Sequence, residues 1–144
     1  MSTIAIRRAL EKHLDTMPDL PAIAWENTNF MPSANEPYIE PILFFVEPDD
    51  IGFRNSPFIQ RGYLQLNLRY PTNEGTVTAQ LKAEQLRDYF FRGLTLVEQD
   101  IPVNIERTPE ITNGSIIDDR FVIRMFIRFY ATIDPLMNDF VPLD

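Results

Sequence analysis

The chain has 144 residues, of which 44% are hydrophobic, so it is long enough and apolar enough for one domain with its own core. Thirteen basic and 21 acidic side chains give a formal net charge of −8, which argues against binding duplex DNA through a general basic surface. The lack of cysteine excludes disulfides and thiol chemistry. No stretch resembles a signal peptide or the ~20 apolar residues of a membrane helix, so we expect a cytoplasmic protein.

The first predicted element is a helix that stops at Pro18. A short strand over 22–26 follows, and a second strand over 38–47 is apolar on both faces, which is typical of a central, covered strand. Polar loops over 27–37 and 48–57 flank the second strand. The helix has apolar residues at helical spacing, and we expect this stripe to be buried: Ile6, Ala9, Leu10, His13, Leu14 and Met17.

A strand and a helix joined by a short turn form the centre of the predicted fold. Residues 58–70 alternate between apolar and polar side chains, the period of a half-buried strand, and Pro71 ends it. The period then becomes helical over 75–91, and Gly93 fits the position just after the helix. Because the turn between them is short, we expect this helix to pack on the strand.

The remaining elements are predicted to be strands. Short strands are expected over 95–98 and 103–107, Asn113-Gly114 predicts a turn, and 120–133 forms a long final strand. This order predicts an α+β fold with one mixed, mainly antiparallel sheet of about five strands and two helices packed on one face. We expect residues 1–133 to form a single domain and residues 134–144 to form a flexible tail.

No residue pattern predicts a catalytic, cofactor or metal site. The single histidine, His13, lies on an apolar stripe, where a structural role is more common than a catalytic one, and no motif supplies a partner. The doublets Asp49-Asp50 and Asp118-Asp119 indicate solvated turns, with a weak divalent-cation site as the alternative. We therefore expect a protein that is not an enzyme.

Two features instead indicate contact surfaces. The two long loops carry large apolar residues, which either make contacts or fold back onto the core. The final strand places aromatic and arginine side chains on one face, which either meets a partner or is covered by a helix. The apolar residues of the C-terminal tail are a third candidate.

The order of elements and several spaced residues resemble one known family. These residues are the helix end at 14–17, Trp25, Asn27, Pro37-Tyr38, the segment from Arg61 to Leu68, Tyr70-Pro71, Gly75 and Phe90-Phe91. On this pattern, the chain up to Ile133 resembles the small tail-terminator proteins of long-tailed bacteriophages and of prophages.

The resemblance implies a ring, usually of six subunits, that caps the tail tube, ends its polymerisation and presents a surface to the head connector. It implies assembly in the bacterial host cytoplasm and a final place in the tail of the virion, with no cofactor. DNA would pass through such a ring, and a negative lumen would let it slide without sequence-specific binding.

On this interpretation, contacts between subunits or to the tube are expected from loop residues Phe30, Met31, Ile51, Phe53 and Arg54. Ion pairs across the ring are expected from arginines in the strands, because arginine suits interface carboxylates: Arg61, Arg69, Arg124 and Arg128. Two alternatives remain open. One is another head–tail joining protein, such as a neck or tail-completion subunit, and the other is a small-ligand-binding α+β domain with a pocket between sheet and helices.

Overall fold

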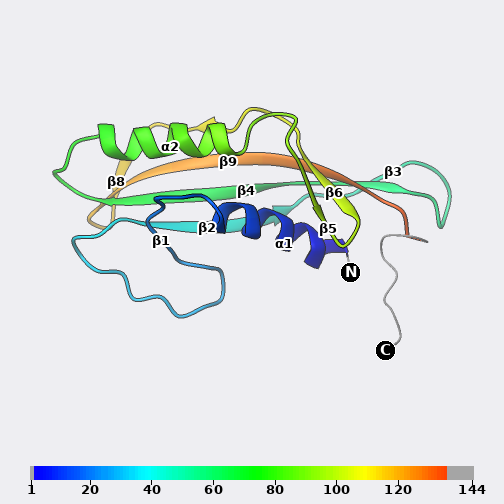
Figure 1. Ribbon diagram of the computed structural model, residues 1–144, viewed down its shortest axis with the longest axis horizontal. Coiled ribbons are helices and arrows are strands. Elements are labelled where there is room, and N and C mark those ends of the chain that lie inside the picture. The colour runs from blue at the N-terminus through cyan, green and yellow to red at the C-terminus, as the bar shows by residue number, and fades with distance from the viewer. Residues whose placement is uncertain (1, 136–144) are drawn as a thin grey trace.

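The computed structural model describes residues 2–135, which form two helices on a curled, mostly antiparallel sheet (Figure 1). The helices are α1 (Ser2–Asp15) and α2 (Val77–Tyr89). The strands run, in spatial order, β1 (Ala22–Ile23), β2 (Tyr38–Phe45), β4 (Phe58–Pro71), β9 (Arg120–Ile133), β6 (Ile101–Ile105) and β5 (Thr95–Glu98). Three short strands pair outside this order: β3 (Asp49–Asp50) with β4, and β7 (Glu110–Ile111) and β8 (Ser115–Ile117) with β9.

Two strands of 14 residues, β4 and β9, form the spine of the sheet. They pair antiparallel along their whole length, from Phe58 opposite Ile133 to Pro71 opposite Arg120. On the other side of β4, β2 is also antiparallel, whereas β1 and β2 are parallel. The sheet is therefore mixed and mainly antiparallel, as the sequence predicts.

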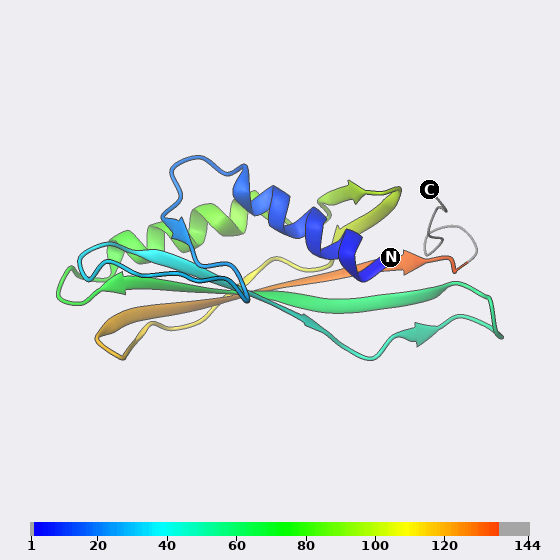
Figure 2. The same cartoon turned by 90° about the horizontal axis from the view of Figure 1, so that it is seen from below.

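Both helices lie on the same side of the sheet (Figure 2). Alternate residues of each strand point to this side, and their side chains fill the space under the helices. The predicted stripes of both helices are buried there, apart from the half-buried His13 and Met17. The α+β prediction, with two helices on one face, is confirmed. The buried set includes Ile6, Leu10, Leu14, Leu64, Leu66, Leu68, Leu86, Phe90, Met125 and Ile127.

The second strand is not central, contrary to the prediction. β1 pairs only with Tyr38 and Ile39, so most of the outer edge of β2 has no neighbouring strand among residues 2–135. Phe44, Phe45 and Val46 are exposed. Phe44 lies on the face that the helices leave uncovered, with Tyr63, whereas Phe45 lies on the helix face, where its ring meets that of the buried Phe129. The apolar run of β2 therefore reflects an accessible surface as well as a core.

Several element ends differ from the prediction. The strand expected over 22–26 ends at Ile23, because Trp25 and Glu26 leave the ladder. The second helix ends with Phe90 at its C-cap, so that Gly93, in a left-handed conformation, lies beyond the position predicted for it. The predicted tail lies, after Pro135, outside the described residues. No helix within residues 2–135 has the length and apolar character to cross a bilayer.

Candidate assembly surfaces

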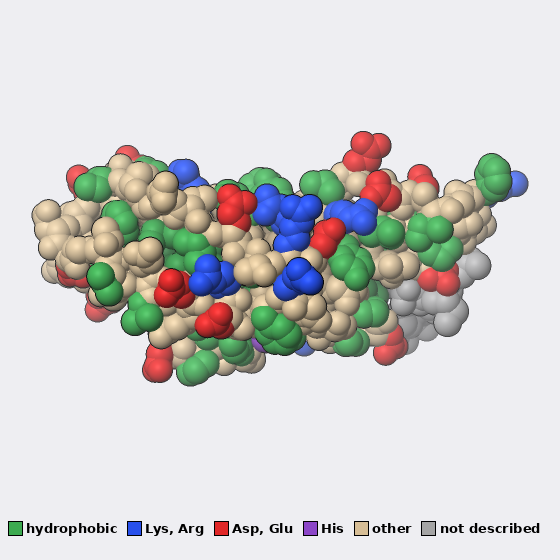
Figure 3. Space-filling model, turned by 90° about the horizontal axis from the view of Figure 1, so that it is seen from above, with side chains coloured by type: hydrophobic (Ala, Val, Ile, Leu, Met, Phe, Trp, Pro, Cys, Tyr) green, Lys and Arg blue, Asp and Glu red, His purple; other side chains and the backbone are tan. Residues whose placement is uncertain are grey.

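The loop between β2 and β4 stands at one end of the elongated molecule, with an apolar tip in solvent (Figure 1). Phe53 is 94% exposed and Ile51 is 57% exposed. Figure 3 shows a hydrophobic and a basic side chain together at the extremity of this end. Arg54, next to Phe53, makes no hydrogen bond or ion pair with the part of the chain that the structure describes. This loop tip therefore has unused apolar and cationic groups.

Local contacts hold this tip in one shape. The backbone N–H of Ser56 donates to the carbonyl of Phe53 at 3.0 Å, and that of Ile51 donates to the carbonyl of Pro57 at 3.2 Å. At the base of the loop, β3 pairs with β4 and Arg61 forms an ion pair with Asp49. The exposed aromatic side chain is thus presented by a preorganised turn, which lowers the entropy lost on binding.

The loop between β1 and β2 lies towards the opposite end of the molecule and is pinned to the sheet (Figure 1). Phe30 is half-buried, with its ring centroid 5.1 Å from that of Tyr38, whereas Met31 is 92% exposed. Arg120, at the start of β9, donates to the carbonyls of Ser33 and Glu36. Its guanidinium also lies 5.1 Å from the centre of the Tyr38 ring.

This loop and the edge of β2 form a surface cavity of about 320 Å³. Its apolar wall is made largely of aromatic and proline side chains, and its polar lining consists of Asn27, Thr28 and the carboxylates of Glu26 and Glu40. We call it the aromatic pocket, with the apolar wall Trp25, Phe30, Pro32, Tyr38 and Pro41.

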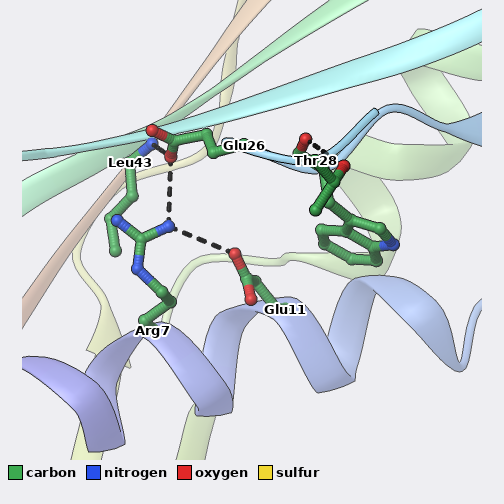
Figure 4. Close-up of polar contacts among 6 residues, drawn as sticks. Arg7, Glu11, Glu26, Thr28 and Leu43 are labelled. Atoms are coloured by element: carbon green, nitrogen blue, oxygen red, sulfur yellow. Dashed lines mark hydrogen bonds and ion pairs between the residues drawn. The ribbon is translucent and has the colours of Figure 1, made fainter. Parts of the chain in front are cut away.

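The carboxylate of Glu26 ties the pocket to both α1 and β2 (Figure 4). It accepts hydrogen bonds from the backbone N–H of Leu43 at 2.8 Å and from the guanidinium of Arg7 at 3.1 Å. Arg7 also donates to Glu11 at 3.2 Å. Burial lowers the pKa of Arg7, but hydrogen bonds and charge attraction from Glu26 and Glu11 outweigh it, so the pKa lies above its usual value.

The face of the sheet opposite the helices carries the four predicted arginines, and three of them have partners within the chain. Arg61 pairs with Asp49 and, at 3.6 Å, with Glu106. Arg69 pairs with Glu40 at 3.1 Å, and Arg128 pairs with Glu110 at 3.3 Å.

Arg124 differs from the other three arginines of this face. Its side chain is exposed and has no hydrogen-bond or ion-pair partner among residues 2–135. Aromatic side chains lie on the same face: Phe44 stacks on Tyr63 with centroids 4.8 Å apart, and Tyr63 meets the edge of Phe126 at 5.8 Å. No helix within the described residues covers them, so this face is available to a partner.

The residues considered for chemistry have structural roles. The Nε2 atom of His13 lies 2.8 Å from the carbonyl oxygen of Tyr89, and the two rings stack 4.1 Å apart, which joins α1 to the end of α2. Asp118 and Asp119 adopt left-handed conformations in the turn between β8 and β9. Within residues 2–135, no group of three or more histidine or acidic side chains could hold a metal ion.

A second surface cavity, of about 410 Å³, lies between α2 and β7 and is lined mainly by polar side chains such as Thr76, Gln80 and Thr112. The space between the helices and the sheet, where a ligand pocket was considered, is filled by the buried core. The assembly surfaces are therefore the features that require an explanation.

Comparison with known proteins identifies the family of this chain. A family model described as phage tail terminator protein matches residues 5–128, which is most of the chain. The chain belongs to the phage tail terminator protein family. The resemblance seen in the spaced residues is thereby confirmed.

Two further comparisons concern the fold and the sequence. A solved structure without a functional description has a TM-score of 0.72 and 24% identity, with 99% of each chain covered, so this tail terminator protein shares its fold. No curated protein matches the chain in sequence.

Family membership gives the class of protein. A tail terminator is a structural component of the phage tail, not an enzyme, and its role implies contact with the tail tube. Sequence reasoning missed Trp25, Glu26 and Arg120 as residues that shape a surface of this protein. The run of asparagine and proline over 27–37 indicated a loop, but nothing in it indicated that Arg120 would hold that loop.

Proposed function

We propose that this tail terminator protein assembles into a ring that caps the tail tube, ends its polymerisation and presents a surface for head joining. The observation that carries the proposal is the exposed, preorganised tip at Phe53. A side chain of this size, 94% exposed at the end of a monomer, favours a role in binding other subunits.

The asymmetry of the molecule favours a ring over a symmetric dimer. The two loop surfaces differ in shape and lie towards opposite ends of the long axis (Figure 1). Contacts between unlike surfaces join subunits head to tail, and such contacts close into a ring when the rotation between neighbours permits. The resemblance to tail terminators makes a hexamer the expected ring.

The partners of the ring follow from its place in the tail. One face binds the tail-tube protein, the other binds the head-connector protein, and DNA passes through the lumen without sequence-specific binding. The net charge of −8 supports this passage, as does the pairing of Arg61, Arg69 and Arg128 with carboxylates of their own chain. Assembly takes place in the bacterial cytoplasm before the protein becomes part of the virion.

The capping role is tested by electron microscopy of particles made without this protein. Overlong tails are expected, because tube growth would lack its stop. Tails of normal length that do not attach to heads would instead assign the protein to head–tail joining. The purified protein, added to growing tubes of tail-tube protein, should also shorten them, and unchanged tube length would contradict the proposal.

A further inference from the structure

We propose that the loop tip of one copy docks into the aromatic pocket of the next copy, with Phe53 entering the pocket and Arg54 facing Glu26 and Glu40. The inference deepens the proposed ring, on which it rests, by naming the two surfaces that join its subunits. The occupant of the pocket is therefore a second copy of this chain.

The positions of the two surfaces require two copies. The tip lies at one end of the molecule and the pocket lies towards the other, so the tip cannot reach the pocket of its own chain (Figure 1). Every subunit carries one tip and one pocket. A head-to-tail arrangement therefore uses all tips and all pockets only when the chain of subunits closes.

The apolar parts of the two surfaces match in size and kind. The pocket has a volume of about 320 Å³, which accommodates an aromatic side chain, and its wall contains Trp25, Phe30 and Tyr38. Aromatic rings gain from edge and offset contacts with one another in addition to the burial of their area. The cavity beside α2 offers fewer aromatic contacts to Phe53, because Phe121 is the one aromatic residue in its lining.

The charges of the two surfaces are also complementary. Arg54 has no partner within residues 2–135, as described above. The hydrogen bonds that Glu26 and Glu40 accept from Arg7, Leu43, Asn67 and Arg69 all go to the Oε1 atoms. The Oε2 atom of each carboxylate is left as an acceptor for a guanidinium from a partner. Both carboxylates are already held in position, so that binding needs little further ordering.

The test uses two variants that each keep one surface. Phe53→Asp has a damaged tip and an intact pocket, and Phe30→Asp has an intact tip and a damaged pocket. Pro32→Asp, at an exposed position of the pocket wall, repeats the second design if Phe30→Asp does not fold. Nuclear magnetic resonance of one isotope-labelled variant mixed with the other, unlabelled, detects contacts too weak for other methods.

The expected result is specific to the two surfaces. Labelled Phe30→Asp, the pocket variant, keeps an intact tip and should show shifted amide signals at residues 50–55 when unlabelled Phe53→Asp, the tip variant, is added. Adding more unlabelled Phe30→Asp should cause no shift. Labelled tip variant should show a shifted indole signal from Trp25, which is unambiguous because the chain has a single tryptophan. The tip should bind at least tenfold more weakly to the damaged pocket.

Other outcomes would overturn the inference. One is the absence of shifts at millimolar protein, and another is shifts confined to other residues. A third is movement of the tip signals only when tail-tube protein is added, which would assign Phe53 to the tube interface. If tip and pocket do not bind but the wild-type protein still shortens tubes, only this inference fails. If they bind and tubes grow unchanged, the capping function fails instead.

Discussion

The Glu26 carboxylate accepts a hydrogen bond of 2.8 Å from the backbone N–H of Leu43, on the outer edge of β2. Alternate backbone amides of a strand point to the same edge, and two residues earlier this edge has Pro41, which carries no N–H. A proline and a carboxylate thus remove two of the donors that another strand could use. The same Glu26 lines the aromatic pocket, so edge protection and pocket shape depend on one side chain.

Replacing Glu26 should destabilise the fold, and more so when the replacement has no hydrogen-bond acceptor. Glu26→Ala leaves the N–H of Leu43 without its acceptor, and we expect the free energy of unfolding to fall by about 1–3 kcal/mol. Glu26→Gln keeps a carbonyl acceptor and should lose about half as much. Urea denaturation measures both changes. Glu84→Ala, on the exposed surface of α2, is the matched control, and a loss in Glu26→Ala no larger than in this control would contradict the prediction.

Replacing Arg120 should release the loop between β1 and β2. The guanidinium donates to two carbonyls of this loop through two nitrogen atoms and lies over the Tyr38 ring. A lysine ammonium group cannot reproduce this planar pair of donors. In Arg120→Lys, amide hydrogen exchange over residues 28–37 should accelerate at least tenfold, while exchange in the middle of β4 stays unchanged. Arg124→Lys, in the same strand but exposed, is the control. Unchanged exchange in the loop would show that other contacts hold it.

Tyr70 should make stability depend on alkaline pH. Burial raises the pKa of Tyr70 above its ordinary value of 10.0, so the unfolded chain loses this proton at lower pH than the folded chain does. The resulting stability is fully present below pH 10.0 and is lost as the pH rises through the raised pKa.

The variant that isolates this effect is Tyr70→Phe, measured by urea denaturation at about pH 8 and about pH 11. The wild-type protein should lose stability relative to the variant by at most about 1.4 kcal/mol per pH unit. Tyr130→Phe, at a half-buried position, controls for removal of a hydroxyl group. A pH profile in Tyr70→Phe that is identical to that of the wild-type protein would contradict the assignment.

Phe53→Asp should weaken assembly without unfolding the subunit. The phenyl group of Phe53 is solvent-exposed in the monomer, so its loss should change the free energy of unfolding by no more than about 0.5 kcal/mol. Light scattering on samples matched in concentration should show smaller assemblies than the wild-type protein forms. Ile116→Asp is the control: it removes another apolar side chain, 70% exposed in β8, and should assemble normally. Equal loss in both variants would mean that added charge, rather than the loop tip, is responsible.

The sequence predicts the long elements because their signals are local. Alternation over 58–70 and 120–133 marks both strands of the spine, and helical spacing marks α1 and α2. Edges are less visible, because the apolar run of β2 looks the same whether or not a neighbouring strand covers its outer side. The prediction of a central strand fails for this reason.

The candidate surfaces depend on contacts between distant residues. Arg120 binds Ser33 across 87 positions, and Glu26 binds Leu43 across 17, and no periodic pattern relates either pair. The partners of Arg61, Arg69 and Arg128 likewise follow from strand register and loop path rather than from local spacing. Exposed loop residues such as Phe53 can be predicted, because a large apolar side chain within a polar loop is visible in the sequence itself.

The pairing of β4 with β9 also constrains when the subunit can form. Residue 58 meets residue 133 and residue 71 meets residue 120, so every rung of the spine joins segments at least 49 positions apart. The helices and the β5–β6 hairpin can appear during synthesis, but β4 gains β9 as its neighbour only after residues 120–133 have left the ribosome. Until then one edge of β4 has no hydrogen-bonding partner along its length, and such an unpaired edge can pair with another chain and aggregate.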